Sequence, residues 1–301
     1  MPSQYKEKRQ SQLRHILLYV AYGDNALYYQ GIKTSILSVL HHCKKSVPPE
    51  IVVISENPAF FADYPIIHFT ITPALKLDWS LNNRYHYRIK NRALAYALDN
   101  LNLGANDKLL ALDTDTYLTR DINELFDKIN VNQSLMFLDE GPLTKKQFTE
   151  YRESYQAPIK LGNEESYHLS HQYHMWGSLM VGITASKRAL IDQADQLLIA
   201  MHQWAPTIRT VEQFAISQVL SNNGELVEGK KLIQHYSHRG RKHFAQANIN
   251  SFFANYGHYA FETQLYYYPA LRLRRTLMAF LSEKVAKLTQ FSNSTSRTKA
   301  I

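Results

Sequence analysis

The sequence predicts an α/β protein in which a mostly parallel β-sheet is covered by helices on both faces. Apolar segments of strand length alternate along the chain with segments whose apolar residues recur at helical spacing. The strand-like segments are almost continuously apolar, which is typical of strands buried on both faces of a parallel sheet. A chain of 301 residues, 45% of them apolar, is also large enough to bury a substantial core.

The first part of the chain supplies four of these strands and two of the helices. The turn signal Gly23-Asp24-Asn25 ends the first strand, and Pro48-Pro49 breaks the chain before the second. The expected elements are, in order, a strand at 15–21, a helix carrying Ile32, Ile36, Val39 and Leu40, strands at 51–55 and 65–71, a helix at 83–101 and a strand at 108–113.

The second part continues the alternation. It predicts strands at 135–138, 179–183 and 232–235, helices at 185–202 and 210–221, and a β segment with a short helix over 117–126. Ligands of open α/β sheets bind beyond the carboxyl ends of the strands. We therefore expect the functional residues after Ala21, Ser55 and Leu112.

The formal charge of +8 is concentrated at the two ends of the chain. Residues 1–14 carry a net charge of +3 and residues 271–301 carry +6, so residues 15–270 are nearly neutral at −1. A nucleic-acid-binding protein usually has a basic stripe across its folded surface, so we expect no nucleic-acid partner. Basic ends on a neutral body fit attachment to an anionic membrane surface better.

The cysteine content and the apolar runs indicate a cytoplasmic protein. A single cysteine, Cys43, excludes a disulfide scaffold and suggests a reducing compartment. The run 16–21 follows basic residues, but it is short for a signal peptide and no cleavage pattern follows it. No run approaches the roughly 18 apolar residues of a membrane-spanning helix. We expect a cytoplasmic location, peripheral to the inner face of the membrane.

We expect four parts along the chain: a basic extension at 1–14, a single domain at 15–265, a basic amphipathic helical tail at 266–291 and a disordered end at 292–301. In the tail, Leu277, Leu281, Val285 and Leu288 share one side of a helix, with Lys284 and Lys287 toward its edge. Such a helix suits an anionic membrane surface. The alternative is that its apolar side packs on the domain.

A pair of carboxylates, Asp113 and Asp115, follows the apolar strand 108–112. Asp-x-Asp is a weak motif alone, and a solvated turn would explain it. Its position at the ligand-binding edge of the sheet favours a functional role. Two carboxylates so close in sequence can bind one hard divalent cation, and Mg²⁺ is commonly held by one or two carboxylates together with substrate phosphates.

The segment 109–126, Leu-Leu-Ala-Leu-Asp-Thr-Asp-Thr-Tyr-Leu-Thr-Arg-Asp-Ile-Asn-Glu-Leu-Phe, resembles the metal-binding segment of GT-A glycosyltransferases, and most closely that of family 8. The resemblance extends with decreasing strength over about residues 15–245. It implies the GT-A fold, with a mostly parallel, Rossmann-like sheet. It also implies transfer of a sugar from a nucleotide-diphosphate donor, with Asp113 and Asp115 on a divalent metal.

The resemblance assigns two further segments to the donor. Tyr19-Val-Ala-Tyr-Gly-Asp-Asn25 is similar to the family's nucleoside-binding loop, which implies donor contacts for Ala21, Asp24 and Asn25. Asp24 or Asn25 could instead simply cap the following helix. His86-Tyr-Arg-Ile89 resembles the family's donor-binding helix, which implies a donor contact for Arg88. The alternative for Arg88 is a solvated helix face.

Two segments near the middle of the chain resemble the family's sugar-binding elements. Thr210-Val-Glu-Gln-Phe resembles a family motif that implies catalytic-site roles for Glu212 and Gln213, with Glu replacing Asp. The alternative is a capping box formed by Thr210 and Gln213. His174-Met-Trp-Gly-Ser-Leu-Met-Val resembles a family strand, but Trp176 stands where a sugar-facing Asn is expected.

Leu232-Ile-Gln-His-Tyr236 resembles the strand end whose His is the family's third metal ligand, which implies that role for His235. Arg241 stands where the family has a diphosphate-binding Lys. Arginine can contact a diphosphate bidentately, so this replacement keeps the charge. A His ligand beside two carboxylates favours Mn²⁺, with Mg²⁺ as the alternative.

The sequence thus predicts a metal-dependent hexosyltransferase that uses a nucleotide-sugar, preferably UDP-linked. The expected acceptor is the hydroxyl of a carbohydrate or glycolipid, for example in lipopolysaccharide or another surface polysaccharide. A sugar nucleotidyltransferase is one alternative, although its Gly-rich loop has no counterpart after the first strand, where Tyr22-Gly-Asp-Asn25 stands. A non-catalytic scaffold with the same fold is the other.

Overall fold

The computed structural model describes residues 13–43, 46–152, 158–161, 165–168, 173–236 and 239–274. The chain divides into two compact units, Met1–Gln234 and His235–Ile301. This division comes earlier in the chain than the boundary at residue 265 that the sequence suggested.

The first unit is built on a sheet that contains, among the described residues, seven strands in the order β12-β6-β11-β4-β1-β2-β3. Their bounds are β1 His15–Ala21, β2 Glu50–Ser55, β3 Ile67–Thr70, β4 Lys108–Leu112, β6 Gln133–Met136, β11 Met180–Thr184 and β12 Glu225–Glu228. All neighbours run parallel except β11, which is antiparallel to both β4 and β6. The predicted α/β class with a mostly parallel sheet is confirmed.

The strand β1 lies inside the sheet, where it pairs with β2 on one side and with the central strand β4 on the other. Leu17 lies opposite Ile51 of β2 and Leu110 of β4. Residues Ile16–Tyr19 are completely buried. The absence of apolar–polar alternation in this run is explained by its burial on both faces. Because parallel strands end on the same side, the chain segments that follow β1 and β4 meet at one edge.

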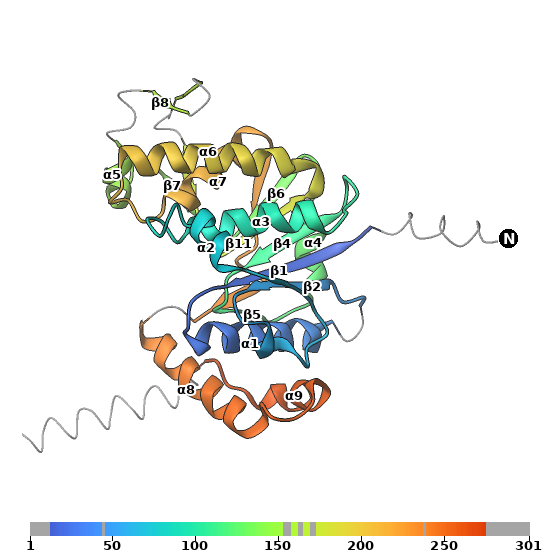
Figure 1. The fold of residues 1–301 in the computed structure, drawn as a ribbon. Coiled ribbons are helices and arrows are strands. Elements are labelled where there is room, and N and C mark those ends of the chain that lie inside the picture. The colour runs from blue at the N-terminus through green and yellow to red at the C-terminus, as the bar shows by residue number, and fades with distance from the viewer. Residues whose placement is uncertain are drawn as a thin grey trace, which may run out of the picture. The chain divides into compact units, whose positions relative to one another are not determined.

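Helices cover both faces of this sheet, as predicted. Figure 1 shows α1 on one side of the sheet and α3 and α6 on the other. The helices of the first unit are α1 Ala26–His42, α2 Pro73–Trp79, α3 Arg88–Asn100, α4 Asn123–Phe126, α5 Thr149–Arg152, α6 Arg188–Trp204 and α7 Val211–Asn222. Asn25 caps α1, since its side chain accepts a hydrogen bond from the Leu27 N–H at 3.0 Å.

Several short elements were not predicted. Besides α2 and β12, these are the antiparallel pair of β7 Asp139–Pro142 with β10 His174–Trp176, and the pair of β8 Ile159–Lys160 with β9 Ser166–Tyr167. The strand β5 Thr116–Leu118 and the helix α4 match the β segment and short helix expected over 117–126. The elements that were not predicted contain too few apolar residues to show a strand or helix period. The segment 117–126 could be predicted because it directly follows the carboxylate pair at the end of a strand.

The second unit contains α8 Arg239–Tyr256, α9 Phe261–Tyr267 and a 3₁₀ turn at Tyr268–Ala270, while β13 Ile233–His235 spans the division. The helical tail was expected from residue 266, but Leu271–Arg274 is not helical. Pro269, which has no backbone N–H, explains why α9 does not continue. The remainder of the expected tail and the expected disordered end lie outside the described residues, as does most of the basic extension 1–14.

A left-handed turn connects α2 to α3. Leu81, Asn82 and Asn83 have φ values of 52°, 57° and 63°. Asn tolerates this conformation, whereas a leucine there is strained. The Asn83 N–H donates to the Ser80 hydroxyl at 3.0 Å, and the Tyr85 N–H donates to the Ser80 carbonyl at 2.9 Å. These bonds fix the position of the residues that begin α3.

Gly182 allows β11 to pack tightly against its surroundings. A Cβ atom at this position would lie 2.6 Å from Ile129 Cδ1 and 2.9 Å from Leu135 Cβ. We therefore expect Gly182→Ala to lower the free energy of unfolding by about 1–3 kcal/mol through overpacking. Urea denaturation measures this change, with Gly104→Ala as the control, because its added Cβ would meet Asp107 Oδ2 at an ordinary 3.6 Å. Equal stability of the two variants would contradict the packing argument.

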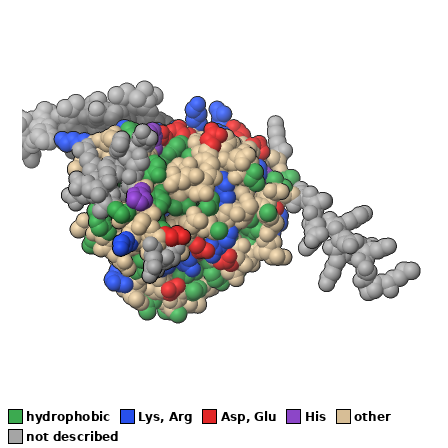
Figure 2. Space-filling model, turned by 90° about the horizontal axis from the view of Figure 1, so that it is seen from above, with side chains coloured by type: hydrophobic (Ala, Val, Ile, Leu, Met, Phe, Trp, Pro, Cys, Tyr) green, Lys and Arg blue, Asp and Glu red, His purple; other side chains and the backbone are tan. Residues whose placement is uncertain are grey.

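The surface carries charges of both signs. Acidic and basic side chains are interspersed on the face shown in Figure 2. Within the described part of the chain, none of the helices is both long and apolar enough to cross a membrane.

Candidate functional site

The carboxylate pair sits in a rigid turn at the end of β4. The Asp113 N–H donates to the Leu179 carbonyl at 2.9 Å, which continues the β4–β11 pairing by one residue. The Thr116 hydroxyl donates to the Asp113 carbonyl at 2.6 Å and closes the turn. Asp113 and Asp115 are thereby held at the carboxyl edge of the sheet, where the sequence predicted a ligand.

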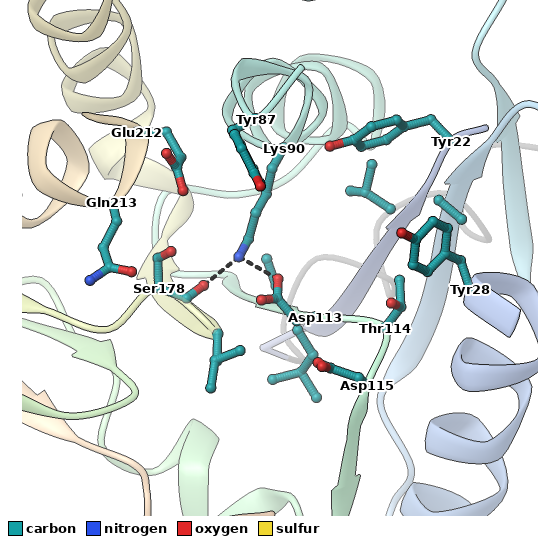
Figure 3. A pocket seen from close by; sticks show the side chains of 15 residues that line it. Tyr22, Tyr28, Tyr87, Lys90, Asp113, Thr114, Asp115, Ser178, Glu212 and Gln213 are labelled. Carbon is teal, nitrogen blue, oxygen red and sulfur yellow. Dashed lines mark hydrogen bonds and ion pairs between the residues drawn. The ribbon is translucent and has the colours of Figure 1, made fainter. Parts of the chain in front are cut away.

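A pocket of about 390 Å³ opens at this edge (Figure 3). It is lined from the ends of β1 and β4, the first turns of α1, α3 and α7, and the residues before β11. The residues are Val20, Ala21, Tyr22, Tyr28, Tyr87, Lys90, Ala111, Leu112, Asp113, Thr114, Asp115, Ser178, Leu179, Glu212 and Gln213. Of the residues that the sequence assigned, the pocket thus brings together Ala21, Asp113, Asp115, Glu212 and Gln213.

Lys90 is the cation of this pocket lining. Its ammonium group donates hydrogen bonds to Asp113 Oδ1 and to the Ser178 carbonyl (Figure 3). The two ion-paired side chains are largely covered, with 21% of Lys90 and 32% of Asp113 exposed. Burial raises the pKa of Glu212, and Lys90 lies close enough to this carboxyl for its charge to oppose that rise. The sequence had placed Lys90 only among the charges around Arg88.

Glu212 is buried in the first turn of α7 and is held by Tyr85. The Tyr85 hydroxyl lies 2.5 Å from Glu212 Oε2 and 2.8 Å from the Arg209 carbonyl, and it accepts a bond from the Glu212 N–H at 3.2 Å. Burial raises the pKa of Glu212, and the Tyr85 hydrogen bond and the Lys90 charge oppose this shift. The alternative of a capping box is not formed, because Thr210 makes no side-chain cap and its hydroxyl pairs with Tyr151 at 2.8 Å.

Gln213 connects the pocket to an acidic side chain outside its lining. It hydrogen-bonds to Glu140 of β7, which is half-buried. Burial raises the pKa of Glu140, and the hydrogen bond from Gln213 opposes the shift. Glu140 therefore supports the amide of Gln213 from the β7–β10 pair, which the sequence did not predict.

Aromatic side chains form another wall of the pocket. Tyr22 follows β1, Tyr28 belongs to the first turn of α1, and Tyr87 immediately precedes α3 (Figure 3). Burial and the charges of Asp113 and Glu212 raise the pKa of Tyr22, so its hydroxyl stays protonated. Rings with hydroxyl tips can cover the face of a base or sugar and also hydrogen-bond to it.

Fewer of the predicted residues around the loop after β1 line the pocket than the sequence suggested. Ala21 lines the pocket, but Asp24 and Asn25 are exposed, and Asn25 caps α1. Gly23, with a φ of 84°, makes the turn, and its N–H donates to a Glu56 carboxylate oxygen. Glu56 in turn pairs with Lys76 at 2.9 Å. This loop is thus held in place from the end of β2.

Arg88 does not line the pocket among the described residues. Its Nε and Nη2 atoms donate to the two Asp195 carboxylate oxygens of α6 at 2.7 and 2.8 Å, and its Nη1 donates to the Asp78 carbonyl at 2.7 Å. Only 9% of each of the Arg88 and Asp195 side chains is exposed. Arg88 thus joins α3 to α6 and to the end of α2. The structure therefore supports neither a contact of Arg88 with the donor nor its exposure to solvent on the face of a helix.

His235 and Arg241 belong to the second unit, so their assignment to the metal and the diphosphate stays a prediction. His235 ends β13, as the sequence predicted, and Arg241 is exposed in the first turn of α8. Among the described residues, no three His, Cys, Asp or Glu side chains gather closely enough to hold a metal by themselves. Asp113 and Asp115 would need further ligands, such as phosphate oxygens.

Sequence reasoning missed Tyr22, Tyr85, Lys90 and Glu140. Two of these could have been predicted from the sequence, because Tyr22 directly follows a predicted strand end and Lys90 lies two residues from Arg88. The other two depend on long-range pairings with α7, from residue 85 to 212 and from residue 140 to 213, which no local pattern reveals.

No protein-family model and no curated protein sequence matches this chain. It does resemble solved glycosyltransferase structures. The galactosyltransferase LgtC in complex with donor and acceptor sugar analogues is 14% identical, with a TM-score of 0.49 over 78% of this chain and 94% of LgtC. An active-site mutant of LgtC is 15% identical, with a TM-score of 0.46 over 71% of this chain and 72% of the other.

The apo form of the glycosyltransferase GlyE from Streptococcus pneumoniae TIGR4 is 13% identical, with a TM-score of 0.42 over 72% of this chain. The match spans only 46% of the GlyE chain.

Proposed function

We propose that this protein is a metal-dependent glycosyltransferase that moves a hexose from a nucleotide-sugar, preferably UDP-linked, to a hydroxyl of a carbohydrate or glycolipid. The observation that carries the proposal is the meeting, in one pocket, of the strand-end carboxylates Asp113 and Asp115 with Lys90, Glu212 and Gln213. These side chains come from three distant parts of the chain. The carboxylates Asp113 and Asp115 can bind a cation, and the ammonium of Lys90 can bind an anion. Glu212 and Gln213 can hydrogen-bond to a polar sugar.

The charges of the pocket support an anionic ligand that arrives with a cation. Its described lining holds three acidic side chains, Asp113, Asp115 and Glu212, against the single basic side chain Lys90. A diphosphate alone would be repelled by this excess of carboxylates. Carboxylate oxygens fit hard divalent cations such as Mn²⁺ or Mg²⁺, so Asp113 and Asp115, with His235 as the predicted third ligand, would hold the cation. When bound, it supplies positive charge to the departing diphosphate.

In the proposed reaction the bond between the anomeric carbon and the diphosphate oxygen breaks, and the diphosphate keeps the electron pair. The acceptor oxygen forms the new bond to the anomeric carbon, and its proton passes to an oxygen of the departing diphosphate. Lys90 stabilises the negative charge that develops on the diphosphate, with Arg241 as the predicted second cation. Glu212 and Gln213 orient or polarise the hexose, and their positions are fixed by Tyr85 and Glu140.

The proposal is tested by incubating the full-length protein with a panel of nucleotide-sugars and Mn²⁺, and by measuring nucleotide release with and without sugar acceptors. We expect release from one donor class above all others, and loss of release with EDTA. Absence of turnover across the panel, together with absence of UDP binding by calorimetry, would contradict the proposal.

Tyr85→Phe tests the positioning of Glu212. The Tyr85 hydrogen bond lowers the pKa of Glu212 against the effect of burial, so its loss should raise that pKa further. We propose that Glu212 orients the hexose in its ionised form. Activity should then rise with pH, and the acidic limb of the pH–rate profile should move to higher pH in the variant. We expect the kcat to fall by about tenfold at neutral pH, which corresponds to about 1.4 kcal/mol.

The matched control is Tyr87→Phe, which removes the hydroxyl of a pocket tyrosine that is 52% exposed. It should leave the acidic limb in place. If the acidic limbs of the pH–rate profiles were identical for wild type and Tyr85→Phe, Tyr85 would not influence the pKa of Glu212.

We also propose that the protein is cytoplasmic and attaches to the inner face of the membrane through its basic tail. The support is the clustering of Arg272, Arg274 and Arg275 ahead of the apolar residues at 277–288. Each basic residue near an anionic leaflet contributes about 1 kcal/mol, so replacing these three with Gln should weaken binding to phosphatidylserine vesicles by about 100-fold. Co-sedimentation at two salt concentrations measures this, and equal binding by wild type and variant would refute it.

A further inference from the structure

The ion pair between Lys90 and Asp113 has a consequence for how a divalent cation would enter the pocket. Asp113 is the first carboxylate of the proposed metal site, and the Lys90 ammonium is bound directly to one of its oxygens. The same ammonium donates to the Ser178 carbonyl, so it is held from two sides. A positive charge therefore already occupies a place next to the carboxylate that the cation requires.

Lys90 is presented from a fixed position. It lies in the first turn of α3, next to Ile89, which is completely buried against the sheet. The arginine two residues earlier anchors this turn to α6 through the Arg88–Asp195 pair. The helix cannot carry Lys90 away from Asp113 without breaking these contacts. The ammonium can change partners only by rotation of its own four-carbon stem.

We propose that Lys90 serves as the resident cation of Asp113 in the donor-free protein, so that a divalent cation binds Asp113 and Asp115 together with the nucleotide diphosphate and not before it. This inference rests on the proposed function, because it uses the same donor and the same cation. It adds an order of binding, and it gives Lys90 the role of setting that order.

Electrostatics explain the order. A divalent cation alone would stand beside the Lys90 ammonium and be repelled by it, in a pocket partly shielded from water. A diphosphate adds negative charge that attracts both cations. The ammonium has three N–H groups, so Lys90 can turn one to a phosphate oxygen while it keeps the Ser178 carbonyl. Asp113 then becomes available to the metal, and nucleotide and metal strengthen each other's binding.

The test measures Mn²⁺ binding to the full-length protein by electron paramagnetic resonance, first without nucleotide and then with saturating UDP. Lys90→Met removes the charge and keeps much of the length, whereas Lys90→Arg keeps the charge. Lys108→Met is the matched control, because Lys108 is a half-buried lysine at the opposite end of β4 that donates to the Phe126 carbonyl at 2.8 Å.

We expect Lys90→Met to bind Mn²⁺ without nucleotide at least about tenfold more tightly than wild type, a change that equals about 1.4 kcal/mol. Lys90→Arg and Lys108→Met should resemble wild type. UDP should tighten Mn²⁺ binding to wild type at least tenfold and to Lys90→Met much less. Adding Asp113→Asn to Lys90→Met should abolish the gained affinity.

Three results would overturn the inference. The first is that wild type binds Mn²⁺ without UDP as tightly as Lys90→Met does. The second is that Mn²⁺ binding to Lys90→Met survives the addition of Asp113→Asn. The third is absence of Mn²⁺ binding in every variant, with and without UDP. The proposed function is judged separately by the donor panel. Nucleotide release can persist after either of the first two results, since it does not depend on the order in which metal and nucleotide bind. After the third result, release that is insensitive to EDTA would contradict metal dependence, whereas release restored by Mg²⁺ would preserve it.

Discussion

Replacing Asp113 with Asn is expected to lower glycosyl transfer by at least about 100-fold, the scale of losing one strong electrostatic contact to a reacting group. The side chain keeps its shape but loses the negative charge that would hold the cation. The fold should remain intact, because the backbone bonds of Asp113 to Leu179 and Thr116 do not involve its carboxylate. Asp115→Asn should behave in the same way.

Nucleotide release and thermal unfolding should be measured on the same preparations. Asp127→Asn provides the control, since Asp127 is an exposed carboxylate that follows α4 and lies outside the pocket lining. Near-normal turnover by either pocket variant would remove the proposed metal site. A large drop in melting temperature would show instead that these carboxylates stabilise the turn.

Arg88→Met is expected to destabilise the protein by about 3–5 kcal/mol, because removing one partner of a buried ion pair leaves the other charge uncompensated. Asp195 would stay buried without a hydrogen-bonded cation among the described residues, because Arg92 Nη1 lies 3.6 Å from Asp195 Oδ2, which is too far for a hydrogen bond. The Asp78 carbonyl at the end of α2 would lose its donor as well. Urea denaturation gives the free energy of unfolding directly.

An exposed arginine supplies the contrast. Arg120 is 66% exposed and lies 4.0 Å from Glu124, so Arg120→Met should change stability by less than about 1 kcal/mol. The double variant Arg88→Met with Asp195→Leu should recover part of the loss, since no buried charge is left alone. Unchanged stability of Arg88→Met combined with weaker nucleotide binding would restore the donor contact that the sequence suggested.

The strands of the sheet were the most predictable part of the fold. The strand β1 was predicted with its observed bounds and β4 to within one residue, because each is an unbroken apolar run between turn signals. The short strands β7, β8, β9 and β10 could not be predicted, since two to four residues carry no period. Their existence depends on pairing with partners elsewhere in the chain.

Pocket residues at strand ends could be predicted, because the sheet topology alone brings them together. Pocket residues on helices could not, because the direction of each side chain around the helix axis decides whether it reaches the pocket. Asp113 and Ala21 lie at strand ends, so the sheet alone brings them to one edge. Arg88 and Lys90 are separated by two residues, which places their side chains about 200° apart around the helix axis. Sequence similarity selected the arginine that faces α6, whereas the lysine faces the pocket.

The order of strands in the sheet also constrains how the protein is made. The strand β11 lies between β4 and β6, yet it follows β6 in the chain by more than 40 residues and β4 by more than 60. During synthesis β6 therefore has no place in the sheet until β11 has emerged, and β4 presents an unpaired apolar edge for roughly 3–14 s at ordinary rates of translation. Such an edge is a template for aggregation. We expect nascent chains halted between these strands to require chaperones, whereas chains that include β11 can close the sheet and complete the pocket.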